Sequence, residues 1–101
     1  MGRYEEALGA YTEALKIVDQ ELQKNPKSYL AWRDKGATLY KIDKYEEAIK
    51  AYDDALKTSP YSLVSGQIWL GKGDAFKALN HDAEANEAYA KAKELGITNP
   101  S

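Results

Sequence analysis

One sequence motif, which we call the repeated phrase, occurs twice in this chain of 101 residues. Residues 3–16 read RYEEALGAYTEALK and residues 44–57 read KYEEAIKAYDDALK, and most aligned positions are identical. A second offset places Trp32 on Trp69 and Gly36 on Gly73. Self-similarity at a period of roughly 20–50 residues is the signature of a repeat architecture, whose units bury their apolar faces only against one another. We therefore expect a stack of copies of one structural unit.

Each unit has the periodicity of two amphipathic helices, because its apolar and small residues recur at steps of three and four. In the first helix they are Trp32, Gly36, Leu39 and Ile42, and in the second they are Tyr45, Ala48, Tyr52, Ala55 and Leu56. Small residues such as Gly36 and Ala48 allow two helix axes to approach to about 8–10 Å. The large aromatic rings are expected to fill the space around that crossing.

The connections between helices also follow a pattern. The residues aligned at the turn inside each unit are Gly2, Asp43 and Asn80. Glycine, Asn and Asp tolerate the left-handed backbone conformation better than other residues, so this position is predicted to adopt it. Pro26 and Pro60 are expected to end the units, since proline cannot continue a helix. Gly96 is suited to the C-terminal cap of the last helix.

With these features the sequence resembles the tetratricopeptide repeat family. Residues 29–62 have the length of one family repeat and match its pattern at Trp32, Gly36, Leu39, Tyr40, Tyr45, Ala48, Tyr52, Ala55 and Pro60. Lys35 and Lys72 stand where the family usually has leucine. The resemblance implies an all-α fold, a right-handed α-α superhelix of five antiparallel helices that make about two and a half repeats.

The repeat alignment predicts a single domain over residues 1–101, made of three parts. Residues 1–26 form a half repeat with an extended helix, residues 27–60 a full repeat, and residues 61–96 a degenerate capping repeat. Three apolar positions of the full repeat become polar in the last one, where Asp82, Asn86 and Lys93 replace Tyr45, Ile49 and Leu56. A polar outer face is what the last helix of a solenoid requires.

The first helix carries an apolar stripe with alternating steps of four and three residues. Its members are Tyr4, Leu8, Tyr11, Leu15, Val18 and Leu22. One interpretation is the wide stripe of a solenoid helix that packs on both neighbours, and the other is a dimer seam of the coiled-coil type. An upstream repeat, a second copy of the chain or a ligand helix would each cover the open part of this stripe.

Composition and motifs argue against several classes of function. The chain has no cysteine and one histidine, His81, so an ordinary zinc site cannot be assembled, and we find no catalytic constellation; no enzyme activity, metal or cofactor is expected. A net charge of −2 argues against binding of nucleic acid. No apolar run approaches the roughly 20 residues of a membrane span and no signal peptide opens the chain, so we expect a cytoplasmic protein without membrane contact.

In the family, the first helices of successive units line a concave face that binds peptides or partner helices. Carried over position by position, the resemblance implies partner-binding residues Arg33, Ala37, Tyr40, Lys41, Leu70, Asp74 and Lys77. Among them Tyr40 and Leu70 offer apolar contact, while Ala37 and the neighbouring Gly71 are expected to leave room for a ligand.

The expected function is therefore a protein–protein interaction scaffold that binds a peptide or helix of a partner protein in this concave groove. Two alternatives stay open. The chain could be a self-associating structural module, a homodimer or a helix exchange through its N-terminal helix. It could instead be a non-catalytic appendage of a larger protein.

Overall fold

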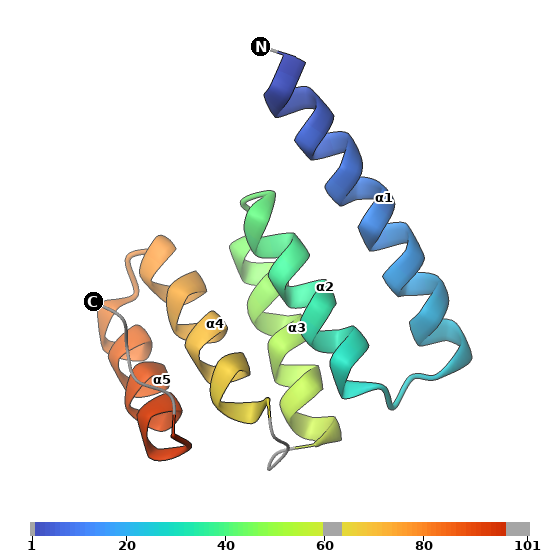
Figure 1. Ribbon diagram of the computed structural model, residues 1–101. Helices are drawn as coiled ribbons and strands as arrows, with labels where there is room; N and C mark the ends of the chain where they lie inside the picture. Colours follow the sequence, from blue (N-terminus) through green and yellow to red (C-terminus); the bar gives the residue numbers. More distant parts are fainter. Residues whose placement is uncertain (1, 60–63, 97–101) are drawn as a thin grey trace.

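The computed structural model describes residues 2–59 and 64–96, which form five α-helices joined by short connections (Figure 1). The helices are α1 (Gly2–Lys24), α2 (Tyr29–Lys41), α3 (Tyr45–Thr58), α4 (Ser65–Ala78) and α5 (Asp82–Glu94). No strand occurs in these ranges. The predicted all-α fold of five helices is confirmed, while the predicted helix stop at Pro60 lies outside the described residues.

Short-range hydrogen bonds fix where α2 begins. The Ser28 hydroxyl accepts a hydrogen bond from the Ala31 backbone N–H at 3.2 Å and caps the helix. The Trp32 indole N–H donates to the Pro26 carbonyl at 2.9 Å. This aromatic residue therefore ties the loop after α1 to the first turn of α2.

The turns inside the two complete units have the predicted backbone. Asp43 has φ 65° and Asn80 has φ 63°, both in the left-handed region. The Lys44 N–H donates to the Leu39 carbonyl at 2.9 Å, which closes α2 with a Schellman-type hydrogen bond. Gly96 follows the last helix at φ 97°, as its predicted capping role requires. The aligned Gly2 is not in such a turn, because α1 begins there.

The helices form two layers. Within the units, α2 packs with α3 and α4 packs with α5. Neighbouring units are joined by contacts of α1 with α2 and of α3 with α4, and α2 also contacts α4. Within the described residues α1, α3 and α5 do not contact one another. The stack is therefore concave on the side of α2 and α4. Its thinnest dimension, 19 Å, corresponds to two helix diameters of about 10 Å each.

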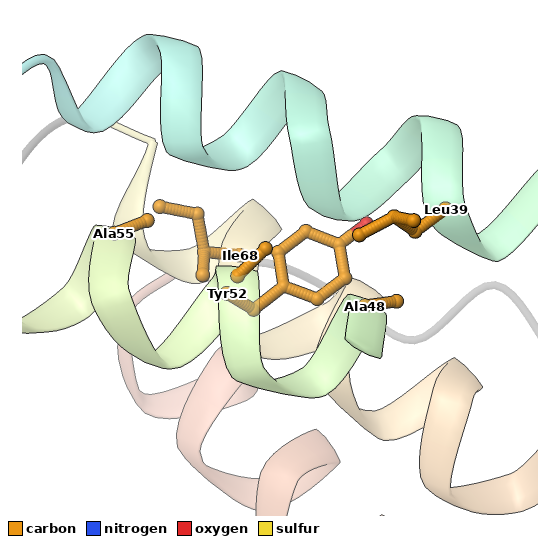
Figure 2. Close-up of a cluster of buried hydrophobic side chains, with 6 residues drawn as sticks. Leu39, Ala48, Tyr52, Ala55 and Ile68 are labelled. Atoms are coloured by element: carbon orange, nitrogen blue, oxygen red, sulfur yellow. The ribbon is translucent and has the colours of Figure 1, made fainter. Parts of the chain in front are cut away.

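The core is centred on Tyr52 of α3, whose ring is 5% exposed (Figure 2). Its neighbours in the buried cluster are Leu39, Ala48, Ala51, Ala55 and Ile68. A Cβ atom added to Gly36 would lie 2.7 Å from this ring, and one added to Gly71 would lie 2.7 Å from its hydroxyl oxygen. One side chain thus fills the space left by missing side chains on both α2 and α4. The predicted role of Gly36 and Ala48 at the helix crossing is confirmed.

In the last unit, a tyrosine ring again fills the space left by a missing side chain, but on one helix only. A Cβ atom on Gly73 of α4 would lie 2.7 Å from the ring of Tyr89 on α5. Trp32 and Trp69 are half-buried, as Tyr89 is, and Trp32 packs against the core cluster. The tyrosines of the second helices are the rings that approach the glycines most closely.

α1 packs against α2 in a different register from the one that the sequence repeat predicts. Lys72 of α4 pairs with Asp53 of α3 at 2.5 Å, and the aligned Lys35 of α2 pairs with Asp19 of α1 at 2.8 Å. The two aspartates are 34 residues apart whereas the repeated phrase recurs after 41, so α1 is displaced by 41 − 34 = 7 residues. Seven residues are about two helical turns, or roughly 10 Å. The first half of α1 therefore extends past α2 (Figure 1).

The apolar stripe of α1 is divided accordingly. Leu22 is buried and Leu15 packs against the core cluster, whereas Tyr4 is 68% exposed and Leu8 38% exposed. The second half of the stripe is thus an ordinary solenoid contact with α2. The first half has no covering helix within the described residues.

The close approach of Tyr52 to Gly36 predicts the effect of a single methyl group. Gly36→Ala should lower the free energy of unfolding by roughly 1–3 kcal/mol, because the ring is held between two helices and cannot move aside. Urea denaturation followed by circular dichroism measures this change. Gly9→Ala is the matched control, since nothing lies within 4 Å of a Cβ there and helix propensity should add about 0.5–1 kcal/mol of stability. Equal effects of the two substitutions would contradict this packing.

The backbone at Asn80 gives a second prediction. Asn80→Val should destabilise the chain by about 1–2 kcal/mol, because a β-branched residue disfavours positive φ. Asn80→Gly should be neutral or stabilising, since glycine adopts this conformation without strain. Melting temperatures of the two variants provide the comparison. A valine variant that melts with or above the glycine variant would be inconsistent with the left-handed turn.

Candidate functional site

The residues predicted to bind a partner lie on α2 and α4, the helices of the concave side. Tyr40 is 36% exposed, and Lys41 and Lys77 are exposed. The half-buried members are Arg33, Ala37, Leu70 and Asp74. Leu30 at the start of α2 adds a side chain that is 44% exposed. We call the surface formed by these residues the inner face.

The hydroxyl of Tyr52 shows which of these residues are brought together. Burial above all, together with the negative charge of Asp74 and the nearby Tyr40, raises its pKa to about 12, while Arg33 acts in the opposite direction. Groups from α2 and from α4 therefore act on one hydroxyl that reaches from α3 toward the inner face. The tyrosine stays neutral at physiological pH.

Asp74 is held in place by a second tyrosine. The Tyr89 hydroxyl donates a hydrogen bond to Oδ1 of Asp74 at 2.6 Å. Burial and this hydrogen bond raise the pKa of Tyr89, so the hydroxyl keeps its proton and remains a donor. The Tyr89 hydroxyl on α5 thus fixes the orientation of the Asp74 carboxylate. This carboxylate presents a hydrogen-bond acceptor on the inner face.

The positive charges of the inner face are distributed unevenly. Nη2 of Arg33 lies 3.0 Å from Oδ1 of Asp34, so its charge is balanced locally. Lys41 lies over the ring of Tyr11 at 5.9 Å, and Lys77 has no ion pair within the described residues. Lys41 ends α2 and Lys77 is next to the end of α4, so uncompensated positive charge gathers at one edge. This edge can attract a carboxylate.

One expectation about the inner face is wrong. Gly71 was expected to leave room for a ligand, but the Tyr52 hydroxyl occupies the space where its side chain would be. The reason is packing, since the close approach of α3 to α4 requires this gap. A ligand on the inner face would meet the tyrosine, not an empty pocket.

Sequence reasoning did not identify the role of Lys35 and Lys72. Each pairs with an aspartate of the preceding helix and lies over a tryptophan of its own helix, at 5.5 Å from Trp32 and 4.8 Å from Trp69. The recurrence of lysine was visible in the sequence. The partner of Lys35 was not, because Asp19 lies on α1, whose register differs from the repeat alignment.

Within residues 2–59 and 64–96 no group of three or more His, Asp or Glu side chains is placed to hold a metal ion. His81 is exposed, stacks on Phe76 and lies 3.3 Å from the carboxylate of Glu84. In the same ranges no helix is both long and apolar enough to cross a membrane.

Comparison with known proteins agrees with this architecture. A chain of a solved structure described as MamA MSR-1 C2 superposes with a TM-score of 0.78 at 22% sequence identity. The match includes 85% of this chain and 48% of that one, so this chain spans about half the length of its structural neighbour. At this identity the likeness concerns the fold. Among curated proteins no match was found.

The sequence family is shown by a direct match. The family model for the tetratricopeptide repeat matches residues 1–62 and, in a second overlapping copy, residues 44–100. The two copies overlap where α3 lies, the helix that carries the second occurrence of the repeated phrase. The chain belongs to the tetratricopeptide repeat family.

Proposed function

We propose that this chain is a non-catalytic scaffold that binds a peptide or helix of a partner protein on its inner face. The observation that carries the proposal is the direct contact between α2 and α4, which places two parallel rows of side chains on the concave side of the stack. An extended or helical segment can lie against both rows at once. Interaction through such grooves uses a few apolar anchors together with oriented polar groups.

The side chains on this face indicate what a partner should offer. Leu30 and Tyr40 provide exposed apolar surface for an aliphatic or aromatic anchor. The fixed carboxylate of Asp74 accepts a hydrogen bond, and a backbone or side-chain N–H of the ligand would supply it. Lys41 and Lys77 at the edge favour an acidic residue or a terminal carboxylate at one end of the bound segment.

This assignment differs from the sequence-based expectation in one respect. Arg33 is paired with Asp34 on the same helix, so its charge is less available than that of Lys77. Charge reversal at Lys77 together with truncation of Tyr40 is therefore the sharper test. Both side chains are exposed, so the substitutions should leave the fold intact.

We expect Tyr40→Ala combined with Lys77→Glu to remove most proteins that the tagged chain captures from a lysate of its host. Quantitative mass spectrometry measures the loss, and peptides from a captured partner then bind the variant at least tenfold more weakly than the parent chain. Lys93→Glu on α5 is the matched control, because it reverses an exposed charge away from the inner face. Equal capture and equal peptide affinity in all three chains would refute the proposal.

A further inference from the structure

The tyrosines at the centre of the two complete units differ in the bonding of their hydroxyl groups. Tyr52 of α3 and Tyr89 of α5 are aligned in the repeat, and each ring packs against the aligned glycine of the preceding helix. The Tyr89 hydroxyl donates a hydrogen bond to Asp74 at 2.6 Å. The Tyr52 hydroxyl has no hydrogen-bond partner within residues 2–59 and 64–96. One of two equivalent hydroxyl groups is therefore without an internal acceptor.

The repeat alignment explains this difference. The residue of α2 that aligns with Asp74 is Ala37, whose side chain has no polar atom. Tyr52 is only 5% exposed and its ring lies in the buried cluster (Figure 2). Because no wholly buried side-chain oxygen in the described part of the chain lacks a partner, the hydroxyl oxygen of Tyr52 reaches the surface. It does so beside Gly71 of the inner face, where a Cβ atom would lie 2.7 Å away.

A hydrogen-bond acceptor lies one helical turn from this hydroxyl. Gly71 and Asp74 are three residues apart on α4, and Cβ positions at this spacing are about 5–6 Å apart on one side of a helix. Oδ1 of Asp74 accepts from Tyr89, whereas Oδ2 forms no hydrogen bond or ion pair with any described residue. Burial is the main cause of the raised pKa of Tyr52, and the negative charge of Asp74 adds to it, which agrees with this proximity. A donor and an acceptor without internal partners therefore lie close together.

We propose that Tyr52 and Asp74 together bind one carboxamide group of the ligand, an inference that rests on the proposed binding of a peptide or helix on the inner face. The Tyr52 hydroxyl donates to the carbonyl oxygen of this group, and the Asp74 carboxylate accepts from its N–H. A carboxamide occurs in the side chains of Asn and Gln and in the peptide bonds of the backbone. Both sources present the same acceptor and donor.

Other ligand groups satisfy this pair less completely. A ligand carboxylate has no donor for Asp74 and is repelled by its charge. The side chains of lysine and arginine have no acceptor for the proton of the Tyr52 hydroxyl. Lys77, three residues from Asp74 on α4, also repels a further cation. A neutral group with one acceptor and one donor is the complement of this pair.

The small exposed fraction of Tyr52 makes the contact selective. A ligand that covers the inner face removes the hydroxyl from water, and a polar group that is left unpaired there reduces the affinity. Asp74 is held by Tyr89, so its carboxylate is not free to turn toward water. A ligand without the carboxamide is therefore rejected, because two polar groups of the protein would be desolvated without partners.

Peptides selected from a phage-displayed library of random dodecapeptides are the probes for a test. An inner-face peptide is one whose affinity, measured by fluorescence anisotropy, falls at least tenfold in the variant Tyr40→Ala with Lys77→Glu. We expect Tyr52→Phe to weaken the binding of these peptides about tenfold, because the ring stays in place and only the donor is lost. Tyr45→Phe is the matched control and should leave binding unchanged, since its hydroxyl already donates to Asp43 at 2.8 Å.

Changes in the peptide identify the source of the carboxamide. The source is a side chain when alanine in place of one Asn or Gln weakens binding to the parent chain but not to Tyr52→Phe. The source is the backbone when an ester in place of one peptide bond has this effect. Either result supports the proposal, because the comparison of single and double changes isolates the contact with the hydroxyl.

Thermal unfolding tests the state of the two hydroxyl groups without a ligand. Tyr52→Phe should leave the melting temperature unchanged or raise it, because the hydroxyl has no internal hydrogen bond to lose. Tyr89→Phe should lower the melting temperature, since it removes the hydrogen bond to Asp74. Circular dichroism measures both variants. An equal loss in the two would show that the Tyr52 hydroxyl has a partner inside the fold and would contradict the proposal.

The binding experiment separates this proposal from the proposed function. Inner-face peptides that bind Tyr52→Phe as tightly as the parent chain would refute the carboxamide site and leave the groove function intact. A loss in Tyr52→Phe that couples to a lysine or arginine of the peptide, or to no amide, would assign the hydroxyl to another ligand group and overturn the proposal. A library without any inner-face peptide would refute the groove function and this inference with it.

Discussion

The rest of the structure depends on one aromatic ring that fits between two helices lacking side chains at the point of contact. Tyr52 of α3 lies against Gly36 of α2 and Gly71 of α4, so a single residue sets the distance from its helix to both neighbours. Since α2 and α4 then converge on the same ring, they touch each other and the stack becomes concave on their side. Curvature, and with it the inner face, follows from this contact.

The same contact links the core to the candidate binding surface. The hydroxyl of Tyr52 reaches the groups of the inner face, and the Tyr89 hydroxyl orients Asp74 from the layer behind. Buried tyrosines place their rings in apolar surroundings and their hydroxyl groups at a polar boundary. The polar groups of the inner face are therefore fixed partly by residues that belong to the core, which lowers the entropy cost of binding.

Several details could be predicted from the sequence because they depend on local chemistry. Asp43 and Asn80 adopt the left-handed turn that their residue types favour, and Gly36 lies at a helix crossing. The inner-face residues were placed on the correct helices by the repeat alignment. The role of Gly71 was missed, because a glycine on an outward helix face looks like free space until the neighbouring tyrosine is placed. The ion pair of Lys35 with Asp19 was missed because α1 continues well beyond the length of α3, which shifts its register against α2.

Local sequence by itself determined the helices, their turns and the family, since amphipathic periodicity and backbone preferences act within a few residues. Only the tertiary structure decided which copy of the repeated phrase is covered. The alanines and the second tyrosine of the phrase are buried in α3, whereas their counterparts in α1 are exposed or half-buried, although most residues of the phrase are identical. The physical reason is that burial depends on the neighbours that a helix meets, and α3 packs against both α2 and α4, whereas α1 contacts only α2 within the described residues.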